Sequence, residues 1–146
     1  MKVAVYIKAS KREVWDAIKD ISTHVEWMAD AEAIRFTSTQ REGVGTTFDC
    51  ATRVGPFRLT DKMEVTEWSP EQALGVRHAG IISGRGHFLL KRRPGGTLFM
   101  WEERLQFPRW MGGAFGRAVA TPVLRRIWLG NLRRLKARVE HRGQLH

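Results

Sequence analysis

The sequence is poor in cysteine and has no long apolar run, and both absences limit what the protein can be. Its single cysteine, Cys50, excludes an internal disulfide, which favours a reducing cytoplasm. No segment approaches the roughly 18 apolar residues of a membrane-spanning helix, and residues 1–10 alternate too regularly for a signal peptide. We expect a soluble, cytoplasmic protein whose 146 residues form one domain with its own core.

Arrangements typical of metal sites and activated nucleophiles are also missing. The chain has no Gly-x-Ser-x-Gly turn, and Gly84-Arg85-Gly86 lacks the strand-to-helix context of a nucleotide-binding loop. The five histidines show no metal-ligand spacing; they are His24, His78, His87, His141 and His146. We therefore expect neither a metal nor a cofactor.

Acidic residues are scarce in the C-terminal quarter. Residues 109–146 hold nine of the 25 lysines and arginines but only one of the 15 acids, Glu140. This basic segment predicts a solvated helix face, a weak general attraction to an anionic surface (nucleic acid or phospholipid headgroups), or contact with an acidic protein. No specific nucleic-acid partner is expected, and the protein is expected to be a monomer or a homodimer. The basic residues on the polar side of the segment are Arg125, Arg126, Arg133, Arg134, Lys136 and Arg138.

The longest periodic segment, 109–142, predicts a major helix with two adjacent apolar rows. The first row is Phe115, Val119, Val123 and Ile127, and the second is Leu124, Trp128, Leu132, Leu135 and Val139. A face this wide needs a cover, so the helix is expected to lie across a curved sheet. Thr121-Pro122 predicts a kink or a boundary between two helices, because proline lacks the amide proton of the preceding turn.

The upstream residues alternate between apolar and polar side chains and predict a bent antiparallel sheet. A strand at 2–8 precedes a helix at 11–21, which Ser10 and Glu13 cap, and a shorter turn at 24–28. Six further strands are expected at 33–39, 45–54, 57–68, 72–78, 81–92 and 97–107. Gly80, Gly84 and Gly86 favour a sharp bend in this sheet. A bent sheet cannot touch a straight helix everywhere, so we expect a cavity between them.

Several short motifs occur in order along the chain. They are Ala9-Ser10 with Glu13-Val14-Trp15-Asp16 and Asp20, Trp27, Gly43-Val44-Gly45-Thr46, Val65-Thr66-Glu67-Trp68-Ser69-Pro70, and Gly95-Gly96-Thr97 with Trp101. Together with the order of elements they resemble the START-like superfamily, also called Bet v 1-like or SRPBCC, and its polyketide cyclase/dehydrase and lipid transport branch.

The resemblance implies an α+β helix-grip fold over residues 1–146. In that fold a curved antiparallel sheet of seven strands wraps around a long C-terminal helix, and two short helices separate strands 1 and 2. It also implies a hydrophobic cavity and, only in some members, catalysis. The polyketide aromatases of the family act through a few polar groups in an apolar pocket. Their catalytic residues do not match this sequence one for one.

Two carboxylates share the phase of apolar neighbours and are the candidate catalytic residues. Asp61 lies between Leu59 and Met63, and Glu103 shares a phase with Trp101. Inside a cavity, desolvation would raise the pKa of either carboxylate toward neutrality and suit it for acid–base chemistry or for orienting a ligand. The alternatives are a salt bridge to a nearby basic side chain or a register that leaves the carboxylates in water.

The strand at 81–92 can present either of two faces to the cavity. The bulk of Phe88 and Leu90 favours these residues inside, with Arg85 and His87 on the surface. A reversal of phase at the glycines would instead make Arg85 an anion or carbonyl anchor and His87 a titratable partner of a carboxylate. The same ambiguity holds for His78, which is in phase with Leu74 and Val76.

We consider three functions. The first is binding of a lipid-like or aromatic molecule, which six tryptophans would suit. The second is polyketide cyclisation or dehydration through Asp61 and Glu103, and the third is an interaction module that docks through the basic helix. Residues 107–116 predict either a gate at the cavity mouth or a loop that buries Trp110. The expected ligand-binding residues are Phe48, Cys50, Met63, Arg85, His87, Phe99, Trp101, Trp110, Phe115, Val119, Val123 and Ile127.

Overall fold

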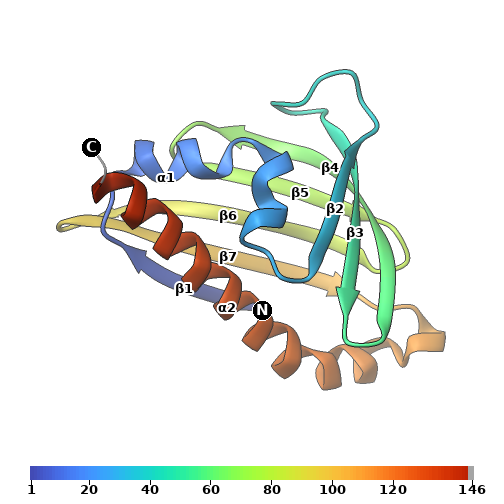
Figure 1. The fold of residues 1–146 in the computed structure, drawn as a ribbon. Coiled ribbons are helices and arrows are strands. Elements are labelled where there is room, and N and C mark those ends of the chain that lie inside the picture. The colour runs from blue at the N-terminus through green and yellow to red at the C-terminus, as the bar shows by residue number, and fades with distance from the viewer. Residues whose placement is uncertain (145–146) are drawn as a thin grey trace.

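The structure is a computed structural model that describes residues 1–144, so His146 lies outside the described residues. Seven strands form one antiparallel sheet in the order β1-β7-β6-β5-β4-β3-β2, in which the first strand pairs with the last (Figure 1). The strands are β1 (Lys2–Ile7), β2 (Ala31–Phe36), β3 (Thr47–Val54), β4 (Phe57–Ser69), β5 (Ala73–Ala79), β6 (Ser83–Arg93) and β7 (Gly96–Gln106). All seven predicted strands are present.

Two short helices connect β1 to β2, as the sequence predicted. In α1 (Lys11–Ile18), the Glu13 amide donates to Ser10 Oγ at 3.1 Å, and the Ser10 hydroxyl donates to the Glu13 carboxylate at 3.2 Å. This capping pair ends the preceding strand and sets the start of the helix. The second helix, η1 (Ile21–Glu26), is a 3₁₀ turn capped by Asp20.

The C-terminal helix α2 (Gly113–Gln144) is continuous and follows a 3₁₀ turn, η2 (Arg109–Met111). Pro122 lies inside α2, and the helix changes direction along its length (Figure 1), as expected where proline removes a backbone hydrogen bond. Thr121 Oγ1 donates to the Arg117 carbonyl at 2.7 Å, one residue before the Ala118 carbonyl that Pro122 leaves without its helical donor.

Only one of the two predicted apolar rows of α2 is buried. Trp128, Leu132, Leu135 and Val139 are at most 5% exposed and pack mainly against β1, β7 and α1. In the other row, Phe115, Val119 and Val123 are 76%, 60% and 53% exposed. The expectation that both rows are covered is therefore wrong for the first half of the helix. Trp110 is also 74% exposed, which rules out one of the two alternatives for residues 107–116, the loop that buries it.

The core lies between the sheet and the second half of α2. Trp101 of β7 stacks on Trp128 with ring centroids 4.7 Å apart, and Phe88 of β6 packs edge-on to Trp101 at 5.3 Å. These elements confirm the expected α+β helix-grip architecture, in which a curved seven-stranded sheet surrounds a long C-terminal helix. Within residues 1–144, no helix combines the length and apolar character needed to cross a membrane.

Candidate functional site

A cavity of about 150 Å³ lies between the concave face of the sheet and the middle of α2. Leu124 and Trp128 of α2 form one wall, and η1 with the segment after it and strands β2 to β7 form the others, with mainly apolar side chains. Its volume is comparable to that of an apolar protein cavity that holds one benzene molecule. The cavity is also open on one side, so a bound molecule can extend beyond it.

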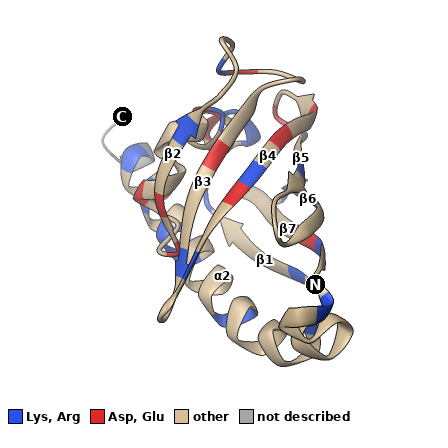
Figure 2. Cartoon of the chain, turned by 90° about the vertical axis from the view of Figure 1, so that its right-hand side faces the viewer, with Lys and Arg blue, Asp and Glu red and all other residues tan. Residues whose placement is uncertain are grey.

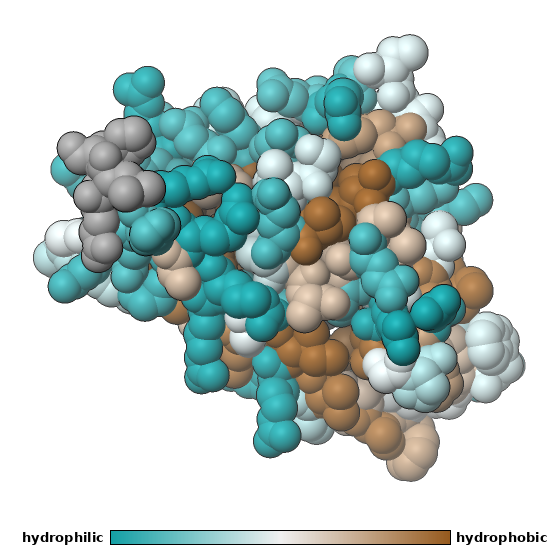
Figure 3. Space-filling view, in the orientation of Figure 1, coloured by the Kyte–Doolittle hydropathy of each residue, from teal (hydrophilic) through white to brown (hydrophobic). Residues whose placement is uncertain are grey.

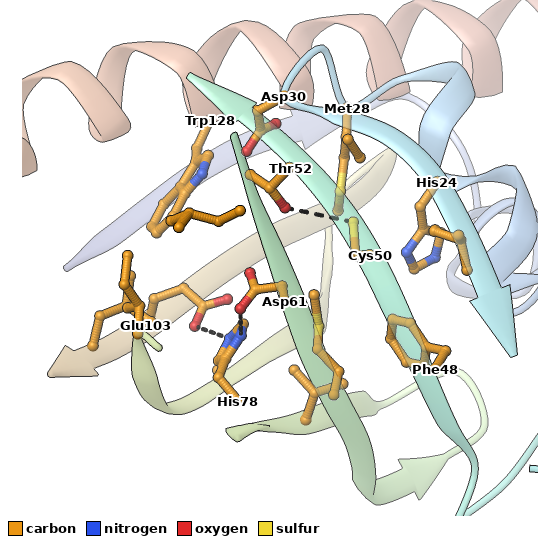
Figure 4. A pocket seen from close by; sticks show the side chains of 18 of the residues that line it. His24, Met28, Asp30, Phe48, Cys50, Thr52, Asp61, His78, Glu103 and Trp128 are labelled. Carbon is orange, nitrogen blue, oxygen red and sulfur yellow. Dashed lines mark hydrogen bonds and ion pairs between the residues drawn. The ribbon is translucent and has the colours of Figure 1, made fainter. Parts of the chain in front are cut away.

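Three ionisable side chains meet at one end of this cavity. His78 Nε2 lies 2.9 Å from Glu103 Oε2, and His78 Nδ1 lies 3.6 Å from Asp61 Oδ1 (Figure 4). Trp101 Nε1 donates to the second oxygen of Glu103 at 3.0 Å. The contact with Asp61 is within ion-pair range but too long for a good hydrogen bond. His78 Nδ1 therefore has no regular hydrogen-bond partner among the described residues. We call Asp61, His78 and Glu103 the His78 cluster.

The sheet forms this cluster because the strand beneath it carries glycine. His78 lies on β5 and Glu103 on β7, with β6 between them, and Gly86 of β6 pairs with Glu103. A Cβ atom at Gly86 would clash with the Glu103 carboxylate. The absence of a side chain at Gly86 therefore lets the carboxylate reach across β6 toward the imidazole. A glycine is also required at position 84 of the same strand, because its φ is 137° and a Cβ atom there would clash with the Arg104 carbonyl.

The two carboxylates keep His78 protonated. Burial lowers the pKa of His78, but the hydrogen bond to Glu103 and Coulomb attraction from both carboxylates outweigh burial and raise it to about 10. The cluster is thus an imidazolium held between two carboxylates at neutral pH. A group with this pKa is a hydrogen-bond donor to a ligand and a poor general base.

A second buried histidine lines another part of the cavity and remains neutral. Burial lowers the pKa of His24 to about 4, against weaker opposing effects from the Ile18 carbonyl and Asp20. Its Nε2 donates to the Ile18 carbonyl at 2.7 Å, which leaves Nδ1 as an acceptor. Burial also raises the pKa of the Cys50 thiol to about 11, so this cysteine is a poor nucleophile. Figure 4 shows His24, Cys50 and the His78 cluster around one space.

The structure brings some of the sequence-predicted residues together at this cavity. Asp61 and Glu103 reach it from β4 and β7, and their shared basic partner is His78. The predicted ligand-binding residues that line the cavity are Phe48, Cys50, Met63, His87 and Trp101. The imidazole of His87 nevertheless bonds to Glu102 on the other face of the sheet, with Nε2 and Oε2 3.0 Å apart.

The remaining predicted ligand-binding residues lie elsewhere. Phe99 is fully buried in the core and Ile127 packs against it, while Arg85 is exposed because Phe88 and Leu90 occupy the inner face of β6. The bulk of Phe88 and Leu90 therefore predicted correctly which face of β6 points inward. The predicted residues on the outer surface of η2 and the first half of α2 are Trp110, Phe115, Val119 and Val123.

Sequence reasoning did not include His78 or Gly86 among the site residues. The signal for His78 was its phase with Leu74 and Val76, which line the same cavity. Gly86 could be predicted only with the knowledge that β6 lies between the strands of His78 and Glu103. Its missing side chain matters because the Glu103 carboxylate crosses over it. Among the described residues, no group of three or more His, Cys, Asp or Glu side chains is arranged to hold a metal ion.

Comparison with solved structures finds the same fold in several proteins. The protein TTHA0849 from Thermus thermophilus is similar over 97% of both chains, with a TM-score of 0.77 and 18% identity. The Zhui aromatase/cyclase from Streptomyces sp. R1128 is similar over 97% of this chain and 93% of its own, with a TM-score of 0.76 and 14% identity. At these identities the likeness shows the fold alone.

A larger protein contains a similar unit. The di-domain aromatase/cyclase StfQ from the steffimycin biosynthetic pathway has a TM-score of 0.81 and 13% identity, and the match covers 99% of this chain but 51% of StfQ. The sequence comparison with curated proteins finds no match. The sequence profile of the family described as polyketide cyclase / dehydrase and lipid transport matches residues 1–140. Because this match covers nearly the whole chain, the protein belongs to that family, a part of the START-like superfamily that its sequence motifs resemble.

Proposed function

We propose that the protein binds a hydrophobic small molecule with an aromatic ring in the cavity and a carbonyl or hydroxyl group against the His78 cluster. The observation that carries this proposal is the position of His78 Nδ1, a buried nitrogen without a regular hydrogen bond among the described residues at one end of an apolar cavity. Such a nitrogen gains a partner when a ligand oxygen lies beside it. The family description, which names polyketides and lipids, supports a ligand of this chemical class.

The charge of the cluster narrows the ligand class further. Counted formally, one imidazolium and two carboxylates give the cluster one negative charge in a cavity with mainly apolar walls. A ligand carboxylate would face this charge while losing its own hydration, so fatty-acid anions are disfavoured. A neutral phenol or ketone avoids that cost, because the imidazolium can donate to its oxygen and Asp61 can accept from a hydroxyl.

A second candidate function is polyketide cyclisation or dehydration at the same site. The observation in its favour is that Asp61 lies 3.6 Å from His78, too far for a good hydrogen bond. This carboxylate is therefore able to accept a proton from a substrate. His78 would then polarise a substrate carbonyl, since its pKa of about 10 keeps the donor proton in place. Asp61→Asn separates the two functions: loss of turnover with retained binding favours catalysis.

The third hypothesis, a module that docks only through the basic helix, is less favoured. Several basic residues of α2 already have partners within the chain. Arg134 Nε donates to the Trp27 carbonyl at 3.0 Å, and Arg138 pairs with Glu26 at 3.0 Å. Lys136 pairs with Glu140 at 2.6 Å. These contacts give the basic side chains a structural role in the helix position, and a pure docking module would need no cavity.

Two measurements test the proposed binding. Native mass spectrometry of protein purified from its own host would identify a co-purified ligand by mass. Titration calorimetry with 1-naphthol and 1-naphthoate compares a neutral and an anionic ligand of the same ring size. We expect 1-naphthol to bind about tenfold or more tightly than 1-naphthoate, because only the carboxylate repels the cluster. Equal or tighter binding of 1-naphthoate would contradict the proposal.

The substitution Gly86→Ala tests whether the geometry of the cluster matters, because it removes no ionisable group from the protein. The new Cβ would displace the Glu103 carboxylate and should reduce the affinity for 1-naphthol about tenfold. The matched control is Gly130→Ala in α2, where a Cβ would meet only the flexible Arg134 side chain at 3.6 Å. Equal affinity in the Gly86→Ala variant would show that the cluster does not contact the ligand.

A further inference from the structure

The first half of α2 and the preceding turn expose a row of large apolar side chains. Trp110, Phe115, Val119 and Val123 are each more than half exposed, and Figure 3 shows apolar surface gathered over this end of the helix. Isolated exposed apolar residues are common, but a contiguous group marks a surface that is covered in use. We call these four residues the apolar ridge.

The apolar ridge lies beside the open side of the cavity. Leu124, the residue after Val123, lines the cavity, and Ile81 lines it while remaining 52% exposed. At the end of the β3–β4 hairpin, Val54 lines the cavity and pairs with Phe57, which is 69% exposed. Exposed apolar side chains thus lie on several sides of the opening. A partner that covers the apolar ridge would also adjoin the cavity mouth.

The charge around the apolar ridge has one sign. No acidic residue occurs between Glu103 and Glu140, and Arg109, Arg117, Arg125 and Arg126 are exposed in this interval. Arg117 and Arg125 donate to the carbonyls of Leu105 and Lys2, so their charges are not neutralised. Within residues 1–144, none of these four arginines forms an ion pair with a carboxylate. Figure 2 shows basic residues but no acidic ones along the first half of α2.

We propose that the apolar ridge docks on an anionic phospholipid bilayer and places the cavity mouth against it. Helices with an apolar row and flanking cations bind in the plane of the interface, where apolar side chains enter the acyl region and arginines contact phosphates. Trp110 suits this position, since tryptophan concentrates at the membrane interface. A second copy of the chain is a poorer partner, because it would bring two sets of unpaired arginines together.

This docking goes beyond the proposed ligand binding and does not depend on it. The apolar ridge and its arginines lie outside the His78 cluster, so vesicle binding can be measured without a ligand. If both proposals hold, an apolar ligand passes between bilayer and cavity without crossing water. Failure of vesicle binding would leave the naphthol test untouched, and failure of naphthol binding would leave the vesicle test untouched.

Flotation with vesicles tests the proposal. The vesicles contain phosphatidylcholine alone, or phosphatidylcholine with about a quarter phosphatidylglycerol, at low and high salt. We expect the wild type to bind the anionic vesicles at least about tenfold more tightly than the neutral ones, and to dissociate at high salt, because screening weakens the arginine contacts. No binding by the wild type, or equal binding to both vesicles, would overturn the proposal.

Three variants identify the surface. Phe115→Glu should weaken binding to anionic vesicles about tenfold or more, since it places a carboxylate in the docking row. The matched control is Val44→Glu, which makes the same kind of change at a residue that is 61% exposed in the β2–β3 loop and should leave binding unchanged. Arg117→Gln with Arg126→Gln should abolish the preference for anionic vesicles. Equal losses in Phe115→Glu and Val44→Glu, or a dimer that Phe115→Glu dissociates, would overturn the assignment.

Discussion

The two halves of α2 both have apolar residues at helical spacing, but their surroundings differ. The second half buries Trp128, Leu132, Leu135 and Val139 against the sheet and α1, whereas Phe115, Val119 and Val123 of the first half face outward. Helical periodicity therefore indicates an apolar face but not what covers it. In this protein one half of the face stabilises the fold. The other half is exposed beside the cavity mouth, where a partner could cover it.

Polar contacts reinforce the difference between the two halves. Asn131 is fully buried, accepts from the Ala29 amide at 2.9 Å and donates to Asp30 at 2.8 Å. Arg134 reaches the Trp27 carbonyl in the same segment. These contacts fix the second half of α2 to the chain that follows η1. By contrast, the long-range polar contacts of the first half are made through exposed arginines. The second half is thus anchored by both apolar and polar contacts.

The largest expected effect comes from truncating the anchored half. Leu135 is fully buried, so Leu135→Ala should lower the free energy of unfolding by about 2–5 kcal/mol, through lost burial and the cavity left behind. Urea denaturation followed by tryptophan fluorescence measures this loss. The control is Val123→Ala in the exposed half of the same helix, which should change stability by less than about 0.5 kcal/mol. Equal losses in the two variants would remove the distinction between the halves.

The next largest effect concerns the sheet beneath the helix. His78→Leu removes the cation between two carboxylates and should lower the free energy of unfolding by about 3 kcal/mol at neutral pH, because it leaves buried charge uncompensated. Adding Glu103→Gln to the same chain should restore part of this loss, since one of the unpaired charges is then absent. If the double variant is no more stable than His78→Leu, the loss comes from packing and the cluster does not act as a unit.

The pH dependence of stability extends this comparison to the two buried histidines. The folded pKa of His78, about 10, lies above its ordinary 6.5, so its contribution to stability is complete below pH 6.5 and is lost as pH rises toward 10. The folded pKa of His24, about 4, lies below the same ordinary value, so its contribution is present above pH 6.5 and is lost as pH falls toward 4. Stability should therefore decrease on both sides of neutrality.

Urea denaturation across pH measures both effects. Between about pH 7.5 and 9 the free energy of unfolding should fall as pH rises, by at most about 1.4 kcal/mol per pH unit, the limit for one proton. The variant His78→Leu supplies the control, because this alkaline slope should be absent while the acid slope from His24 remains. An alkaline slope that persists in the variant would assign the effect to other groups.

The fold and part of the site could be predicted from the sequence, for reasons that particular residues make clear. Local rules were sufficient for Ser10 and Glu13, which form the expected capping pair, and for Phe88, whose bulk identified the inner face of β6. Alternation also predicted that Asp61 and Glu103 face the same cavity, which both residues line. These features depend on neighbours a few residues away, and that information is present in a single sequence.

The remaining features depend on contacts between distant segments. The meeting of His78 with Glu103 requires the strand order and the missing side chain at Gly86, 17 residues before Glu103 in the chain. The exposure of Phe115 depends on where the sheet ends beneath α2, and periodicity contains no information about that boundary. Sequence reasoning assigned Phe115, Val119 and Val123 to the cavity because their spacing was correct for a buried row.

The smallest expected stability change is the most direct test of the exposed half. Phe115→Ser should change the free energy of unfolding by less than about 0.5 kcal/mol, because the ring is 76% exposed and the two residues have similar helix propensities. Chemical denaturation over a range of protein concentrations measures it. A loss above about 2 kcal/mol would mean that the ring is buried in solution. If that loss grew with concentration, a second copy of the chain would be covering the ring; if it did not, the first half of α2 would pack on its own sheet, and the two halves would no longer differ.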